Sequence, residues 1–224
     1  MNDIAMTPAS AWARMKMGND HFIHGAPEHP RQDVERRAET AIAQFPQAAL
    51  FGCADSRLSA EIIFDCGLGD LFVVRNAGQV MSSSVVGSLE YAVNTLGVPL
   101  IVVLSHDDCG AVGVAIDQDR EDAPPLPPHI YSIIESIEPA VTRVRLAGGK
   151  KRGEELDSSV IGREHLRDTV SGLLASSELI SLAVAEGKLA IVGANYTLAE
   201  GRVTPDVIIG SIAEDPLASV NSQN

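Results

Sequence analysis

The sequence predicts an α/β fold in which helices flank a central, mostly parallel β-sheet. Four short runs are continuously apolar and rich in β-branched residues, as is typical of strands covered on both faces: residues 48–53, 71–75, 100–104 and 189–194. Between the second and third runs, residues 83–96 carry apolar side chains at helical spacing. A strand, a crossover helix and a further strand in this order indicate a parallel sheet.

Other segments predict helices around this sheet. Residues 7–24 are amphipathic, with Trp12 and Phe22 on one side, and we expect an N-terminal helical arm (1–30) that packs on a second copy of the chain. The charged, proline-containing segment 117–160 predicts an exposed excursion. We also expect a short helix, a helix within the excursion, a long helix and a frayed tail: residues 32–43, 129–146, 163–185 and those after 214.

Size and composition predict one domain spanning residues 1–224, because 224 residues can bury one good core. The net charge of −13 argues against nucleic acid and against anionic membrane surfaces as partners, since both require a basic face. The chain has three cysteines, an odd number, and a chain of this size does not need disulfides for stability, so we expect no disulfide framework. With no signal-peptide pattern and no apolar run of membrane length, we expect a cytoplasmic protein.

Three residues able to bind a metal lie at the ends of two predicted strands. Cys53 ends the first run, His106 follows the third, and Cys109 comes three residues later. Neighbouring strands lie about 5 Å apart, which would bring these side chains within reach of one ion. Two thiolates and one imidazole leave a fourth position open, as in catalytic zinc sites. Each cysteine alone is more often a core residue, and Cys66, with no partner at metal spacing, is expected to be structural.

Asp55 and Arg57 follow Cys53 in a turn that must pass beside the metal. The Asp55 carboxylate has two options, to become the fourth ligand in a closed state or to pair with the planar Arg57 guanidinium. An ordinary surface pair in a turn is the alternative to a catalytic dyad.

Three stretches together resemble the β-class carbonic anhydrases: residues 53–57 (Cys-Ala-Asp-Ser-Arg), 74–78 (Val-Arg-Asn-Ala-Gly) and 106–112 (His-Asp-Asp-Cys-Gly-Ala-Val). The resemblance covers about residues 7–115 and 160–213. It implies a zinc enzyme, with one Zn²⁺ per chain, that interconverts carbon dioxide and bicarbonate through zinc-bound hydroxide. The family's zinc ligands match Cys53, His106 and Cys109, and its dyad matches Asp55 and Arg57.

The resemblance also implies a substrate pocket and an oligomer. Gln44 matches the family's bicarbonate-contacting glutamine, and Phe72 and Tyr91 match residues that line the pocket, often from a partner subunit. Ala77 and Val80 would add an apolar floor, and Gly110 a backbone N–H. A homodimer or homotetramer is expected.

The sequence departs from the family pattern at several positions. Ser105, Asp108 and Ala77 replace residues that the family usually has there. Leu50 stands where bicarbonate-regulated members have tryptophan, although Arg75 and Tyr196 of that site are present.

Two other functions stay open at this point: hydrolysis of carbonyl sulfide or carbon disulfide on the same fold, and a non-catalytic zinc protein. The intact Asp55–Arg57 pair argues against both. The remaining histidines are candidate proton carriers but are expected to be solvated surface residues: His21, His24, His29, His129 and His165.

Overall fold

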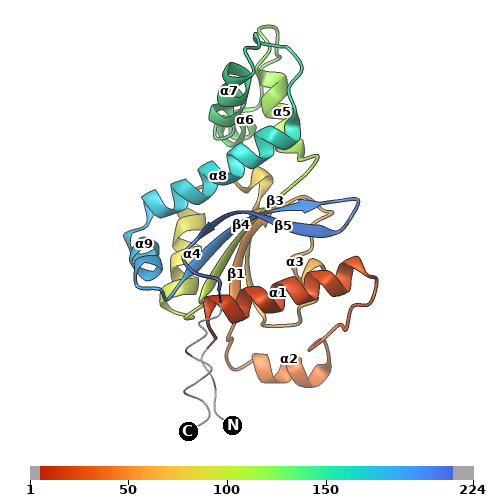
Figure 1. Cartoon of the computed structure of the whole chain (residues 1–224), viewed down its shortest axis with the longest axis vertical. Coiled ribbons are helices and arrows are strands. Elements are labelled where there is room, and N and C mark those ends of the chain that lie inside the picture. The colour runs from red at the N-terminus through yellow and green to blue at the C-terminus, as the bar shows by residue number, and fades with distance from the viewer. Residues whose placement is uncertain (1–5, 214–224) are drawn as a thin grey trace.

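A computed structural model describes residues 6–213 of the protein (Figure 1). Its centre is a five-stranded sheet in the order β2-β1-β3-β4-β5. The first four strands are parallel, and β5 is antiparallel to β4. The strands are β1 Ala48–Cys53, β2 Leu71–Asn76, β3 Leu100–His106, β4 Ala190–Thr197 and β5 Arg202–Ile209. The predicted fold class and the four predicted strands are confirmed.

The fifth strand was not predicted from the sequence. β5 lies at the edge of the sheet, and much of it is exposed or only half-buried. It contains Pro205, beside an irregularity in its pairing with β4. Proline cannot donate to a ladder and is confined to edges and bulges. An edge strand that is only partly buried needs no continuous apolar run, which is why the pattern that revealed the other strands missed this one.

Helices cover both faces of the sheet (Figure 1). The central strands β1 and β3 are wholly buried, because their alternate side chains point to opposite faces and helices cover both. One face packs against α1 (Pro8–Ile23) and α3 (Ala60–Ile63), and the other against α4 (Ser83–Asn94), α8 (Ser158–Ser176) and α9 (Glu178–Ala185). The predicted crossover helix over 83–96 is therefore confirmed as α4.

Helix α1 packs on its own chain. Thr7 caps it by accepting from the Ser10 N–H, and Trp12 and Met15 are buried against the sheet. Gly18 allows a close approach to the backbone of Phe64, because a Cβ there would overlap the Phe64 carbonyl. The Asn19 amide donates to two carbonyls of neighbouring elements. Trp12 is therefore covered within the chain while Phe22 is only partly buried, and packing of this arm on a second copy stays a prediction.

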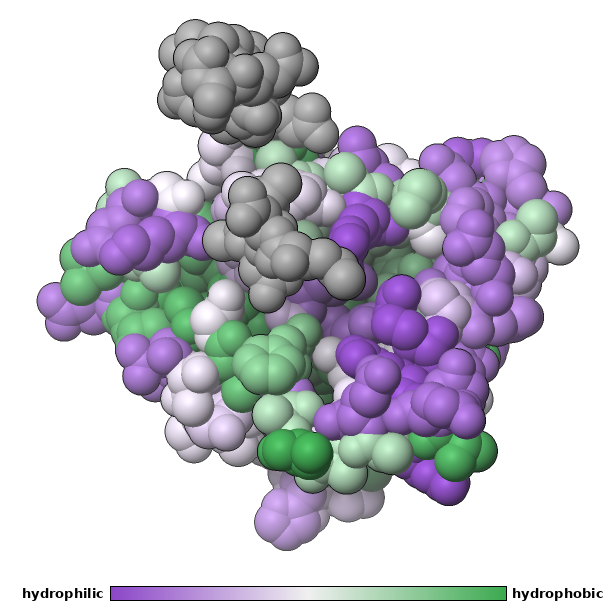
Figure 2. Space-filling view, turned by 90° about the horizontal axis from the view of Figure 1, so that it is seen from below, coloured by the Kyte–Doolittle hydropathy of each residue, from purple (hydrophilic) through white to green (hydrophobic). Residues whose placement is uncertain are grey.

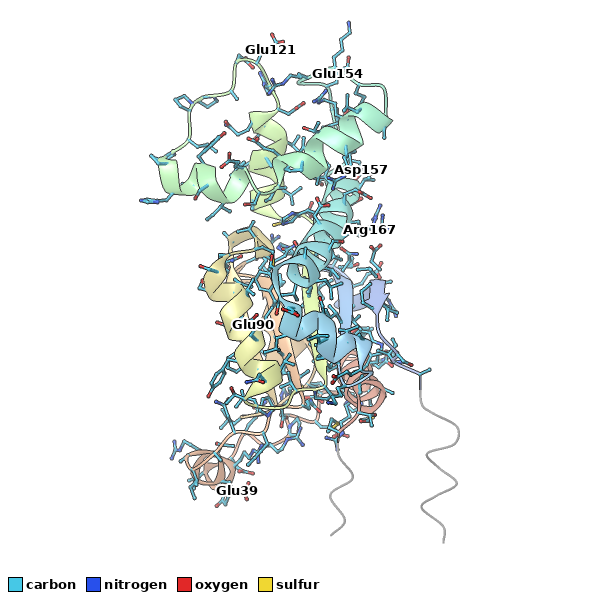
Figure 3. All side chains as sticks on the ribbon, turned by 90° about the vertical axis from the view of Figure 1, so that its left-hand side faces the viewer. Glu39, Glu90, Glu121, Glu154, Asp157 and Arg167 are labelled. Carbon is cyan, nitrogen blue, oxygen red and sulfur yellow. The ribbon has the colours of Figure 1, made fainter. Side chains whose placement is uncertain are left out.

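The predicted long helix over 163–185 is two helices, α8 and α9, bent by 97° at Ser177. Ser177 is extended, with φ −135°, and its hydroxyl accepts from the Ile180 N–H to start α9. The same hydroxyl donates to Glu90 of α4 at 2.7 Å, and Figure 3 shows Glu90 facing this junction. A serine that caps a new helix therefore ends the old one, which apolar periodicity alone does not reveal.

Three helices form a lobe that projects from one end of the sheet: α5 (Gly110–Gln118), α6 (Pro128–Ile134) and α7 (Glu138–Ala147). Glu121 and Glu154 lie towards its tip (Figure 3). The single helix predicted over 129–146 is interrupted between α6 and α7. The lobe buries Ile134 and Ile137, which belong to the same apolar core as one face of the sheet, so the segment predicted as an exposed excursion is partly packed onto the domain.

The opposite end of the molecule carries the short helix α2 (Val34–Thr40) and the approach to β1. Apolar and polar areas alternate on the surface seen from below (Figure 2). Ile42 and Phe45, between α2 and β1, have exposed fractions of 91% and 81%.

The tail predicted to fray after residue 214 lies outside the described residues. Within them, no single helix is both long and apolar enough to cross a membrane, and only the bent pair α8–α9 passes that test by length and composition.

Candidate metal centre

Three metal-competent side chains meet at the carboxyl ends of β1 and β3. Cys53 is the last residue of β1, His106 is the last of β3, and Cys109 is the N-cap of α5. One donor atom from each lies within 4.8 Å of the others, and all three residues are buried. Parallel strands collect ligands at this edge, so the fold itself brings together residues that are far apart in the sequence.

The spacing of these atoms fits a tetrahedral ion. Two thiolates bound to one zinc ion at about 2.3 Å would lie roughly 3.8 Å apart. The Cys53 and Cys109 sulfurs are 4.0 Å apart. The donor set therefore has the dimensions of a Cys₂His metal site.

The His106 ring is oriented for binding a cation. Its Nδ1 lies 2.7 Å from the Asp107 carbonyl oxygen, which can only accept, so Nδ1 carries the hydrogen. Nε2 then carries the lone pair, and it is buried with no hydrogen-bond partner among residues 6–213. Metal-binding histidines typically donate the N–H of one ring nitrogen to an acceptor such as a backbone carbonyl and bind the metal through the other nitrogen. His106 has this arrangement.

The Cys53 and Cys109 side chains share a hydrogen bond between their sulfur atoms. The Cys109 thiol donates to Cys53 and lowers the pKa of Cys53 to about 4, and the Gly78 N–H adds to this effect. The same bond and burial raise the pKa of Cys109. A bound cation can replace the shared proton, because a metal ion deprotonates a coordinating thiol.

Asp55 and Arg57 form a bidentate ion pair at the rim of this cluster. Arg57 Nε donates to Asp55 Oδ1 at 2.9 Å and Nη2 donates to Oδ2 at 2.7 Å. The Arg57 guanidinium holds the pKa of Asp55 well below its usual range. Asp55 Oδ2 is 3.9 Å from His106 Nε2, so the carboxylate lies beside the metal-competent atoms while it is paired with Arg57.

Arg75 fixes the exit of β1, a role that was not predicted from the sequence. Its Nε donates to the Cys53 carbonyl at 2.9 Å and its Nη2 to the Asp55 carbonyl at 2.6 Å. Arg75 is aligned with Gly52 in the pairing of β1 and β2. The arginine therefore holds the backbone that carries both a candidate ligand, Cys53, and the Asp55 carboxylate.

A tight turn after β2 faces the cluster. The Asn76 side chain closes it by bonding to both the N–H and the carbonyl of Val80. Within the turn, Gly78 adopts φ +71° and donates its N–H to the Cys53 sulfur at 3.3 Å. Ala77 and Val80, the expected apolar floor, belong to the same turn, and Gly110 is the first residue of α5.

Comparison with known proteins identifies this architecture. Residues 48–203 match the family model described as carbonic anhydrase. The chain belongs to the β-carbonic anhydrase family. It is 47% identical over 208 residues to "Carbonic anhydrase 2" of Mycobacterium tuberculosis, with 93% of this chain and 97% of that protein covered. It is 45% identical to the "Carbonic anhydrase" of Mycolicibacterium smegmatis, with coverages of 92% and 97%.

Solved β-carbonic anhydrases share the fold. CcaA superposes with a TM-score of 0.68 at 22% identity, covering 92% of this chain and 94% of that structure. A structure from a study of two tetrameric β-carbonic anhydrases of Sordaria macrospora superposes with a TM-score of 0.66 at 22% identity, with coverages of 87% and 91%.

Three residues that match the family's pocket do not meet the cluster within one chain. Gln44 precedes β1, whereas Cys53 ends it, and a strand of this length spans about 20 Å. Phe72 is aligned with Ala49 near the start of β1. Its ring lies 6.1 Å from that of Tyr91 on α4. In this β-carbonic anhydrase, Gln44, Phe72 and Tyr91 of one subunit therefore lie away from the end of the sheet that carries the metal-competent residues of the same subunit.

His165 was wrongly predicted to be a surface residue. It lies on the buried side of α8, with 2% of its surface exposed, and its Nε2 is 2.8 Å from the Gly78 carbonyl oxygen. Its spacing of four residues from Ile161 and from Thr169, both buried, was the available signal. Leu50 lies in the core of β1, and Tyr196 lies beside His106 in the pairing of β3 with β4.

Proposed function

We propose that this chain catalyses the reversible hydration of carbon dioxide to bicarbonate and a proton, with one Zn²⁺ per chain held by Cys53, His106 and Cys109. The observation that carries the proposal is the convergence of three buried donor atoms within 4.8 Å. The curated relatives bear the name carbonic anhydrase. Zinc held in this way would supply a water molecule acidified towards neutral pH and a Lewis acid beside the substrate.

Asp55 and Arg57 are proposed to orient the reacting water. A carboxylate near the fourth position can accept a hydrogen from that water and so aim its oxygen lone pair at carbon dioxide. Arg57 binds both oxygens of Asp55 and so restrains the carboxylate from becoming a fourth ligand itself. The guanidinium also offers charge to a bicarbonate product, and the Gly110 N–H at the start of α5 is a further donor.

A second copy of the chain is proposed to complete the pocket. Gln44 lies between Ile42 and Phe45, whose side chains are almost fully exposed, and Tyr91 is 47% exposed. Strand β2 is an edge strand, so its outer side is open to another chain. Large exposed apolar side chains beside an open edge mark an interaction surface. We therefore expect a homodimer or a tetramer built from dimers, in which Gln44, Phe72 and Tyr91 approach the cluster of the partner.

The test is a stopped-flow measurement of carbon dioxide hydration on purified protein, with zinc counted on the same sample. Activity together with about one zinc ion per chain supports the proposal. One zinc ion per chain without hydration activity would contradict the reaction, and activity in a sample free of zinc would contradict the metal assignment. Assaying carbon disulfide beside carbon dioxide separates the hydrolase alternative.

A further inference from the structure

His165 is a buried titratable residue that the proposed chemistry does not use. Its Nε2 is 2.8 Å from the Gly78 carbonyl oxygen, which can only accept, so Nε2 carries the hydrogen. Its Nδ1 is buried and has no hydrogen-bond partner within the described part of the chain. Burying a ring nitrogen without a partner costs free energy. The one hydrogen bond that the ring makes within the described residues is the donation from Nε2 to Gly78.

The acceptor of that bond, Gly78, is itself a donor to the metal cluster. The Gly78 N–H points at the Cys53 sulfur at 3.3 Å. His165, Gly78 and Cys53 thus form a continuous chain of two hydrogen bonds that leads from the middle of α8 to a proposed zinc ligand.

The geometry of Gly78 depends on its neighbours. Its φ of +71° is a left-handed conformation that other residues rarely adopt. A Cβ at this position would lie 2.9 Å from the Ala111 Cβ and 3.1 Å from the Ile137 Cδ1. Ala111 and Ile137 of the lobe therefore lie against one side of the turn, while His165 of α8 binds the Gly78 carbonyl. Thr169, one helical turn after His165, approaches the next carbonyl, that of Gln79, at 3.4 Å.

We propose that His165 is a positioning residue of the metal centre: its bond to the Gly78 carbonyl fixes the turn so that the Gly78 N–H is aimed at the Cys53 sulfur. The inference rests on the proposed zinc site. An N–H donor withdraws electron density from a thiolate, so that thiolate donates less charge to a bound cation. Two thiolates would bring the net charge of the zinc centre close to zero. Withdrawal of electron density from one thiolate would therefore increase the Lewis acidity of the centre.

The test compares two amide substitutions that differ by one methylene. The amide nitrogen of His165→Gln can take the place of Nε2, whereas that of His165→Asn is too short to reach Gly78. Leu173→Ala is the control, because Leu173 is fully buried on the same helix and has no bond to the turn. Zinc affinity is measured by competition with a chelator. The energy of the sulfur-to-metal charge-transfer band is measured after loading with Co²⁺.

We expect His165→Asn to bind zinc about 10-fold more weakly, because the released turn no longer holds the Cys53 sulfur in position, and this loss of preorganisation outweighs the stronger donation by the freed thiolate. Its charge-transfer band should move to longer wavelength, because a thiolate that loses a donor holds its electrons less tightly. His165→Gln should restore both values. Leu173→Ala should keep the wild-type band even if it is less stable.

Wild-type affinity and band position in His165→Asn would overturn the positioning role, and so would an equal shift in Leu173→Ala. If His165→Asn does not fold, NMR of the wild-type protein loaded with ¹¹³Cd decides. Scalar coupling between the Gly78 amide proton and ¹¹³Cd through the Cys53 sulfur supports the inference, and its absence overturns it. A wild-type chain that binds no zinc would instead overturn the proposed function, and the positioning role with it.

Discussion

Arg57 donates to both oxygens of Asp55, and the same guanidinium donates from Nη2 to the Asp108 carbonyl at 3.1 Å. Asp55 follows β1 and Asp108 follows β3. The ion pair therefore links the two strand ends that carry the metal-competent residues. This bridging position distinguishes the pair from an ordinary surface pair, which would bind only within its own turn.

Substituting Arg57→Ala should release Asp55 and allow it to occupy the fourth metal position. We expect the rate of carbon dioxide hydration to fall about 100- to 1,000-fold, since orienting and electrostatic groups contribute on that scale. Zinc content should stay at the wild-type value. Arg57→Lys should recover only part of the rate, because an ammonium lacks the bidentate geometry.

The lobe offers a matched control for this experiment. Arg120 and Asp122 have the same two-residue spacing and the same paired bonds, both at 3.0 Å, on an exposed loop. Arg120→Ala should leave rate and zinc content unchanged. Near-normal rates in Arg57→Ala between pH 6 and 9 would reduce the Asp55–Arg57 pair to a structural turn.

Cys109→Ala should abolish tight zinc binding and hydration together, because two ligands remain. Cys66→Ala is the control: Cys66 is also a buried cysteine, and burial raises its pKa to about 12, so it stays a thiol. We expect one zinc ion per chain and near wild-type rates in Cys66→Ala. Elemental analysis of both variants gives the answer, and full activity in zinc-free Cys109→Ala would contradict the site.

Tyr91→Arg should weaken self-association and lower hydration activity, because it places a charge in the proposed contact between subunits. Tyr131, on the lobe, has a similar exposed fraction, 42% against 47% for Tyr91, so Tyr131→Arg is the control. Sedimentation velocity at micromolar concentration should show a dimer or larger species for wild type and Tyr131→Arg, and a shift towards monomer for Tyr91→Arg. A wild-type protein that is monomeric and fully active would refute the shared pocket.

The free energy of unfolding should fall as the pH drops below about 6.5, in part through His165. Burial lowers the pKa of His165 below this ordinary value. Above pH 6.5 the ring is neutral in both states. Below it the unfolded chain takes up a proton that the folded chain does not, so the native state loses stability as pH falls through the folded pKa. His165→Gln should flatten this decline.

Urea denaturation at several values between pH 5 and 7.5, with zinc in fixed excess, measures the effect. His24→Gln, at an exposed histidine, should keep the wild-type slope. An identical slope in His165→Gln would show that the buried ring is not responsible.

Sequence patterns predicted the parts of the fold that depend on local periodicity. The buried strands and α4 have continuous or helical apolar spacing, and Cys53, His106 and Cys109 lie at strand ends that a parallel sheet must bring together. Features that depend on one side chain meeting a distant partner were not predicted. The break at Ser177 depends on Glu90, the burial of His165 depends on Gly78, and the docking of α1 depends on the missing Cβ of Gly18.

The separation of Cys53 from Cys109 by 56 residues has a consequence for the protein in the cell. With zinc bound, the ion is a removable cross-link that closes this loop, and closing a loop of that length stabilises the native state by about 4 kcal/mol in the chain-entropy treatment used for disulfides. Chains that fail to acquire metal would unfold more often and be degraded first. Metal supply would then set the abundance of the enzyme as well as its rate.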